Sequence, residues 1–181
     1  MELQALSRYR SPSAKEKGLP SFKKLIYLDY DGVLHDDDVY FHPKRGIYLD
    51  APNRQLFEWM PILETLLVPH PDVGIVLSTS WVRVKSFSYA KERLSLVLQE
   101  KVVGATFHSR EMRKSTFDDM SRGAQVVQDV SRRQPLSWLA IDNDDEDWPA
   151  THSDKLVLTQ DRTGLSDPKV QIALAKALFR L

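Results

Sequence analysis

The feature that most constrains this chain is the apolar run Leu25–Leu28, which ends in two aspartates separated by one residue. A short, continuous apolar run flanked by turn-forming residues is typical of a strand buried on both faces. Carboxylates are costly there unless something compensates their charge, so Asp29 and Asp31 are predicted to leave the core at the strand's end and face a ligand. Two clustered carboxylates repel each other, and a hard cation such as Mg²⁺ relieves that repulsion. The segment therefore predicts a metal-assisted site, with an acidic loop after a core strand as the alternative.

The composition excludes several other classes of function. The chain has 181 residues, of which 42% are hydrophobic and 28% charged, and its formal net charge is +0. A neutral balance provides no global attraction to nucleic acid or to anionic membranes. Cysteine is absent, which excludes disulfides, thiolate metal sites and a cysteine nucleophile. No apolar stretch approaches bilayer-spanning length and no secretory segment is evident, so we expect a cytoplasmic protein without membrane contact.

Strands and helices are predicted to alternate after residue 21. The strands are predicted at the apolar runs 25–28, 73–77, 101–106, 138–141 and 156–158. The helices are predicted from Pro61, after Trp81 with Phe87, Leu94, Val97 and Leu98 on one face, at 123–133 and at 170–181. Gly46 and the alternation around it predict a hairpin, whereas 109–121 is predicted to be irregular. Residues 1–21, rich in Ser, Arg and Lys, are predicted to form a flexible arm attached to a domain at 22–181.

This alternation predicts an α/β fold with three layers, a Rossmann-like arrangement around a central parallel sheet of about five strands. Polar clusters follow the first, second and fourth strands, at 29–31, 78–81 and 142–147. Parallel strands place their carboxyl ends at the same edge of a sheet. We therefore expect these three clusters, far apart in the sequence, to meet in space and form one site.

Four motifs occur in the order typical of one family. They are Asp29-Tyr30-Asp31-Gly32-Val33-Leu34 after the first strand, Ser78-Thr79-Ser80 after the second, Arg122 ahead of a helix, and Asp142-Asn143-Asp144-Asp145 after the fourth. Over residues 24–181 the chain resembles the haloacid dehalogenase-like (HAD) superfamily of phosphotransferases and phosphatases. The segments 78–81, 102–106 and 164–166 further resemble the HAD-type branch found in Swiss-army-knife RNA-repair proteins.

The resemblance implies a role for each motif residue. Asp29 would be the nucleophile that forms an aspartyl-phosphate, and Asp31 would be the general acid that protonates the leaving alkoxide and later activates water. Thr79 would donate a hydrogen bond to a phosphoryl oxygen, and Arg122 would neutralise charge on the equatorial oxygens. Mg²⁺ would be held by Asp29, Asp142 and the backbone carbonyl of Asp31.

Two of these assignments have alternatives. The family has Lys more often than Arg at the third motif, and Lys114 is the alternative to Arg122 as the phosphate-binding base. An arginine is tolerable there because its guanidinium binds two oxygens at once. In the second motif, Ser78 or Ser80 is the alternative to Thr79.

The fourth motif departs from the branch pattern, because Asn143 stands where a second acid is common. Glu146 or Asp147 is expected to reach the metal through water instead. The second acid of the first motif, Asp31, argues against carbon–halogen cleavage, since the true dehalogenases of the family lack it.

Several neighbouring residues are given less specific interpretations. His35 and His42 are interpreted as surface histidines, with a position at the substrate entrance as the alternative. The segment Asp36–Asp38 is interpreted as a solvated turn. Trp81 is expected either to stack on a substrate base or to pack in the interior.

No segment is long enough to hold a large cap domain, since 34–73 already carries a hairpin and a helix and 103–122 is short. An open site admits large substrates or requires a protein or RNA partner that closes it. By resemblance, we expect an Mg²⁺-dependent phosphatase that hydrolyses a phosphomonoester of a nucleotide, another small molecule or a nucleic-acid end. The alternatives are a catalytically degenerate HAD-like binding module and phosphoryl transfer to an acceptor other than water.

Overall fold

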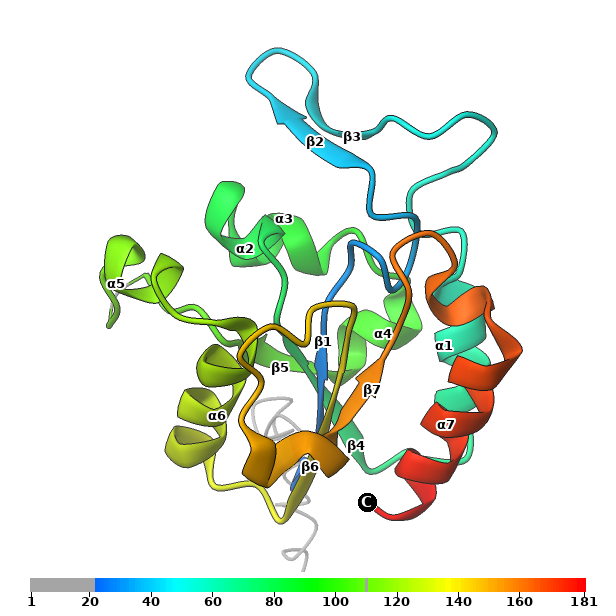
Figure 1. Cartoon of the computed structure of the whole chain (residues 1–181), viewed down its shortest axis with the longest axis vertical. Helices are drawn as coiled ribbons and strands as arrows, with labels where there is room; N and C mark the ends of the chain where they lie inside the picture. Colours follow the sequence, from blue (N-terminus) through cyan, green and yellow to red (C-terminus); the bar gives the residue numbers. More distant parts are fainter. Residues whose placement is uncertain (1–21, 110) are drawn as a thin grey trace, which may run out of the picture.

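The structure is a computed structural model that describes residues 22–109 and 111–181 (Figure 1). Its centre is one parallel sheet of five strands in the order β5-β4-β1-β6-β7. The strands are β1 (Lys24–Leu28), β4 (Val73–Leu77), β5 (Val102–Ala105), β6 (Ser137–Asp142) and β7 (Leu156–Leu158). The predicted parallel sheet of about five strands is therefore confirmed. The predicted arm at 1–21 lies outside the described residues, so the boundary after residue 21 stays a prediction.

Helices cover both faces of the sheet, which gives the three predicted layers (Figure 1). Successive side chains of a strand point to opposite faces, so the apolar run in β1 supplies two cores. Ile26 and Leu28 join the larger core under α1 (Met60–Leu67), α4 (Leu96–Lys101) and α7 (Pro168–Phe179). Leu25 and Tyr27 join the smaller core under α6 (Arg122–Arg133). Burial on both sides explains why β1 is apolar along its length.

A two-stranded hairpin, β2 (Val39–His42) and β3 (Gly46–Leu49), stands apart from the sheet, above the edge where the central strands end (Figure 1). Gly46 has φ 79°, a left-handed conformation that suits a tight turn. The segment between β1 and β4 holds this hairpin and α1, and it contains no large cap domain. The hairpin predicted around Gly46 is thus present.

Two local predictions were wrong. The helical stretch after Trp81 is three short helices, α2 (Trp81–Val84), α3 (Phe87–Lys91) and α4. The side chains of Ser86 and Ser95 accept hydrogen bonds from Tyr89 N–H and Leu98 N–H, so each serine starts a new helix. The segment predicted to be irregular contains α5 (Lys114–Asp118).

Two short 3₁₀ helices, η1 (Ala150–Lys155) and η2 (Gly164–Ser166), complete the elements of the described residues. Throughout 22–109 and 111–181, the helices are too short or too polar to cross a membrane.

Candidate active site

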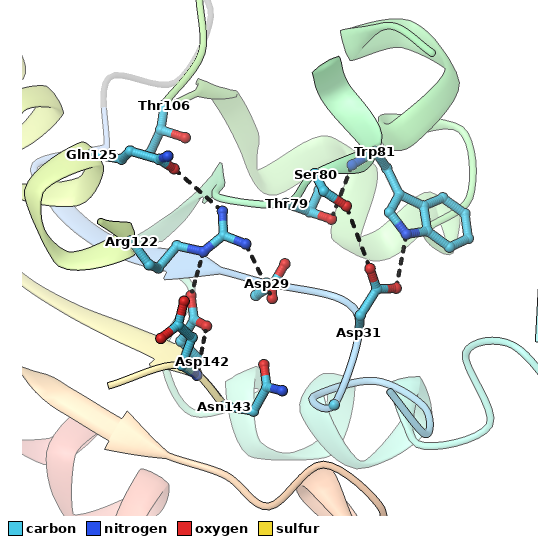
Figure 2. A network of polar contacts seen from close by, with 12 residues as sticks. Asp29, Asp31, Thr79, Ser80, Trp81, Thr106, Arg122, Gln125, Asp142 and Asn143 are labelled. Carbon is cyan, nitrogen blue, oxygen red and sulfur yellow. Dashed lines mark hydrogen bonds and ion pairs between the residues drawn. The ribbon is translucent and has the colours of Figure 1, made fainter. Parts of the chain in front are cut away.

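The carboxyl ends of the central strands gather four of the predicted residues in one place (Figure 2). Asp29 follows β1, Thr79 lies just beyond β4, Asp142 ends β6 and Arg122 begins α6. The ladder hydrogen bonds continue to the edge, because Asp29 N–H donates to the Ile141 carbonyl at 3.1 Å. The convergence expected from parallel strands is therefore what the structure shows.

Arg122 lies between the two acidic side chains. Its Nη2 is 3.6 Å from Asp29 Oδ2, and its Nε is 3.3 Å from Asp142 Oδ2. Gln125, one turn along α6, accepts a hydrogen bond from Arg122 Nη1 at 3.4 Å. The Gln125 amide nitrogen in turn donates to the carbonyl oxygens of Phe117 and Met120, so the glutamine is itself fixed. The sequence reasoning missed Gln125, although its spacing of three residues from Arg122 places it on the same helix face.

The sequence around Arg122 explains how the guanidinium reaches the site. Ser121 caps α6, since its side chain accepts a hydrogen bond from Ala124 N–H. A Cβ atom at Gly123 would lie 2.6 Å from Pro149 Cδ, so only glycine lets the first turn of α6 pack this closely on the segment after β6. The close approach brings Arg122 over Asp142.

The two carboxylates share one guanidinium, and their pKa values are raised. Burial, reinforced by the charge of Asp31, raises the pKa of Asp29 to about 6 despite the opposing effect of Arg122. Burial and the neighbouring charge of Asp29 raise the pKa of Asp142 well above its ordinary value. The pKa of Arg122 is raised by both carboxylates, although burial opposes the rise. The site therefore holds more negative charge than its own arginine balances.

The residues fit a hard cation through oxygen atoms from two side chains. Among the described residues, Asp29 Oδ1 is a buried oxygen without a hydrogen-bond partner. In the same part of the chain, Asp142 Oδ1 accepts one hydrogen bond, from the backbone N–H of Asp144 at 3.1 Å. Within 22–109 and 111–181, no group of three or more His, Cys, Asp or Glu side chains is arranged to hold a metal. The carboxylate of Asp31 points away from Asp29 and Asp142, toward Trp81. Its backbone carbonyl is therefore the atom that would bind the metal, as predicted from the sequence.

The carboxylate of Asp31 points toward the start of α2 (Figure 2). Its Oδ1 lies 2.8 Å from Trp81 Nε1 and 3.1 Å from His35 Nε2, and its Oδ2 lies 3.4 Å from Ser80 Oγ. His35 is 0% exposed, so the interpretation of this residue as a surface histidine was wrong. Trp81 is 2% exposed, which supports the packing alternative over stacking on a substrate.

Gly32 makes this arrangement of Asp31 attainable. Its φ is +66°, and a Cβ atom there would lie 2.6 Å from the Asn143 side chain. The Gly32 carbonyl accepts a hydrogen bond from Thr159 Oγ1 at 2.7 Å. A glycine after the second aspartate therefore lets the chain turn sharply beside the end of β6.

Of the alternatives raised for the third and fourth motifs, Lys114 lies away from the cluster, whereas Asn143 lies beside Asp142 (Figure 2). Lys114 has a side chain that is 61% exposed and pairs with Asp118 on α5, outside the cluster around Asp29. Asn143 Nδ2 donates to Asp161 Oδ1 at 3.0 Å. Glu146 and Asp147 are exposed. Asp144, which the sequence reasoning did not single out, is the further acid whose charge acts on Arg122 and Asp142.

Two other findings bear on the neighbourhood of the site. Asp36 is buried and accepts a hydrogen bond from the Asp38 N–H at 3.1 Å, so the prediction of a solvated turn was wrong for Asp36.

Arg83, which the sequence reasoning also missed, supplies a second guanidinium. It extends from α2 and forms an ion pair with Asp118. Burial and then the positive charge of Arg122 lower the pKa of Arg83, which shows that the two cations act in the same region. Its position three residues after Ser80, on the first turn of α2, is a signal from which it could have been found.

A family model described as the HAD domain in Swiss Army Knife RNA repair proteins matches residues 25–170. This chain belongs to that family. The matched region runs from β1 into α7 and includes all four motifs, so the HAD-like fold expected from them is confirmed. The corresponding searches of curated proteins and of solved structures gave no match. Membership in the family supports a phosphatase-type hydrolase or a function related to RNA repair.

Proposed function

We propose that this HAD domain is an Mg²⁺-dependent phosphomonoester hydrolase that acts through an aspartyl-phosphate on Asp29. The observation that carries the proposal is the pair of buried carboxylates, Asp29 and Asp142, that share the single guanidinium of Arg122 at the carboxyl edge of the sheet. Such a surplus of buried negative charge is unfavourable unless a cation completes the site, and perturbed carboxylates of this kind cluster at functional sites.

Mg²⁺ bound by Asp29, Asp142 and the backbone carbonyl of Asp31 would supply the positive charge that lets a phosphate approach the nucleophile. A carboxylate oxygen of Asp29 attacks phosphorus, and the bond from phosphorus to the leaving oxygen breaks as Asp31 gives that oxygen a proton. Thr79 and Arg122 hold the phosphoryl oxygens during the transfer. Asp31 then takes a proton from the water that hydrolyses the aspartyl-phosphate.

The hairpin supports nucleotides or nucleic-acid ends as the substrates. Phe41 on β2 is 48% exposed, and the ammonium group of Lys85 lies 4.6 Å from the centre of its ring. Arg45 similarly lies over the ring of Tyr48, at 5.7 Å. Tyr48 is only half-buried, and aromatic rings at a surface beside cations are typical of proteins that stack unpaired bases and bind the phosphate backbone. The description of the family, which refers to RNA repair, agrees with this substrate class.

The cellular setting is also a proposal. The absence of cysteine and of a membrane-spanning helix in the described part supports a cytoplasmic protein. The lack of a large cap supports a site that a protein or RNA partner closes when the substrate binds.

The test is a phosphate-release screen with the purified full chain over nucleotides, sugar phosphates, aryl phosphates and phosphorylated RNA or DNA ends. We expect release that requires Mg²⁺, stops with a chelator and falls by at least about 10³-fold in Asp29→Asn. Product analysis separates hydrolysis from transfer to another acceptor. If wild type and Asp29→Asn are equally inactive but bind RNA without Mg²⁺, the protein is instead a degenerate HAD-like binding module.

A further inference from the structure

An aromatic box surrounds one side of the Asp31 carboxylate, with Trp81, His35 and Tyr30 buried and Phe57 partly buried. Trp81, Phe57 and His35 contact one another, with ring centres 5.3 Å apart for Phe57 and Trp81 and 4.9 Å apart for His35 and Phe57. Tyr30 packs edge-on against Trp81 and fixes its own hydroxyl on the Ala90 carbonyl. Rings locked in this way have no freedom to follow a moving carboxylate.

The polar atoms of the box are directed at a single oxygen of Asp31. An indole nitrogen is only a donor, so Trp81 donates to Oδ1 at 2.8 Å. His35 Nε2 contacts the same oxygen at 3.1 Å, as a donor when Asp31 is ionised. The other oxygen, Oδ2, has only the longer contact with Ser80 Oγ at 3.4 Å. Oδ1 is thus held by buried groups, and Oδ2 is left to exchange a proton with a ligand.

We propose that Trp81 is a positioning residue that aims Asp31 Oδ2 at the leaving oxygen of the substrate, with His35 as its second support. The inference rests on the proposed phosphatase function and adds to it the groups that orient the acid. A general acid works only within hydrogen-bond reach of the atom it protonates, and an error of about 1 Å in position costs as much as about 10²-fold in rate.

The local sequence links this support to the phosphate-binding residue. The backbone N–H of Trp81 donates to Thr79 Oγ1 at 3.4 Å, so one short segment carries both side chains. The turn at Gly32 brings His35 back to Asp31, where the two residues form an isolated bridge. The spacings Asp31-x₃-His35 and Thr79-x-Trp81 therefore place both supports beside the acid.

The test compares Trp81→Phe with wild type on two substrates, because phenylalanine keeps an aromatic ring but lacks the N–H. An alkyl phosphate needs a proton on its leaving oxygen, whereas dinitrophenyl phosphate leaves without one. We expect kcat/KM, which covers the steps up to departure of the leaving group, to fall about 10- to 100-fold for the alkyl phosphate. For dinitrophenyl phosphate the change is expected to stay within about threefold.

Trp138→Phe is the matched control, since Trp138 is a buried tryptophan on β6 that packs on Tyr27 in the other core. It is expected to leave the ratio of the two substrates unchanged. His35→Gln retains a nitrogen donor and is expected to preserve the ratio, whereas His35→Leu is expected to shift it in the same direction as Trp81→Phe. Thermal unfolding of each variant shows whether it is folded.

A nuclear magnetic resonance measurement tests the hydrogen bond without any reaction. The chain has four tryptophans, and the indole N–H signal of Trp81 is the one lost in Trp81→Phe. In Asp31→Asn this signal is expected to move upfield, because an amide oxygen is a weaker acceptor than a carboxylate. A Trp81 signal that does not move would overturn the inference.

The outcomes separate this inference from the proposed function. If wild type hydrolyses neither of these phosphates nor any substrate of the screen described above, the proposed function fails and the positioning role fails with it. If wild type is active but Trp81→Phe lowers both substrates equally, or neither, the tryptophan is merely structural. In that case the positioning role is overturned while the phosphatase function stands.

Discussion

Two ionic clusters lie at opposite ends of the same helix, α6, and their charge balance is reversed. At the last turn, the buried carboxylate of Asp129 pairs with both Arg132 and Arg133, and it accepts the Tyr27 hydroxyl at 3.0 Å. At the first turn, two buried carboxylates share the single guanidinium of Arg122. One cluster has a surplus of guanidinium groups, and the other has a surplus of carboxylates.

In the Asp129 cluster, which we call the complete cluster, the protein itself balances the charge of the carboxylate. The Arg122 cluster requires a further cation from solvent for its charge to be balanced. A buried carboxylate with two cations and a hydroxyl has its charge and its hydrogen bonds satisfied. Asp29 keeps one buried oxygen without a partner among the described residues, and its pKa is raised. Residue identity alone does not distinguish the clusters, since each contains Asp and Arg. Only the surplus of negative charge favours the cluster around Arg122 as the candidate ligand site.

Removing the shared cation should have the largest effect. Arg122→Gln is expected to lower kcat/KM for a phosphate ester by about 10³-fold, because it removes the charge proposed to hold the phosphoryl oxygens. Arg122→Lys, which keeps the charge but loses the two-pronged geometry, is expected to retain part of the activity. Arg132→Gln is the matched control at the complete cluster, and its activity per folded molecule should stay within about twofold of wild type. Equal losses in both glutamine variants would contradict the comparison.

The surplus charge predicts an unusual dependence of stability on pH. Between about pH 4 and about pH 6 the folded protein retains a proton on Asp29 that the unfolded chain has already lost. The metal-free protein should therefore lose stability as the pH rises through this window, by on the order of 3 kcal/mol. Asp29→Asn should show a smaller loss, because only Asp142 then remains as a buried carboxylate with a raised pKa. Urea unfolding of both proteins with a chelator present measures the two profiles. Parallel profiles would show that Asp29 does not carry the penalty.

The complete cluster should contribute to stability and not to chemistry. Asp129→Asn removes the charge that pairs with Arg132 and Arg133, and it is expected to lower the free energy of unfolding by about 2 kcal/mol. The loss is moderate because both arginines are near enough to the surface to be solvated. Urea unfolding gives the stability, and phosphate release per folded molecule should be unchanged. A selective loss of activity would mean that the two ends of α6 are coupled.

The smallest effect is expected at the hairpin, and it tests which class of substrate binds beside the cluster of Asp29, Asp142 and Arg122. Phe41→Ala should lower kcat/KM for a phosphorylated oligonucleotide end by about tenfold through lost base stacking, with no change for an aryl phosphate. Phe179→Ala is the control, since Phe179 is 79% exposed at the end of α7. Identical values for Phe41→Ala and wild type on both substrates would exclude the hairpin as a base-binding surface.

Most of the sheet was predictable because its signals are local. The runs at 73–77 and 156–158 are strands with the predicted bounds, and the run before Asp29 differs by one residue. The break between α3 and α4 was missed, although Ser95 carries a local signal for it, because the apolar spacing of Leu94 and Leu98 was given more weight than the cap. The sequence around Ser95 was therefore sufficient to predict the helix break, and the error was to prefer the apolar spacing over the capping residue.

The side-chain geometry of the site was less predictable. That Arg122 lies between Asp29 and Asp142 depends on how closely α6 approaches the segment after β6, and Gly123 permits an approach that no pattern measures. The burial of His35 and the bond from Trp81 to Asp31 depend on rings supplied by separate segments of the chain. Sequence spacing places residues near an edge, but it does not say which atoms point at one another.

From the sequence alone came the alternation of strands and helices, the edge at which the polar clusters meet, and the residue types available there. These follow from local hydrophobic pattern and from the rule that parallel strands end at one edge. Tertiary structure decided which carboxylates share a cation, which oxygen of Asp31 is held by Trp81 and His35, and which histidine is buried. Those outcomes depend on contacts between residues distant in the chain, because charge balance and hydrogen-bond direction are set by packing.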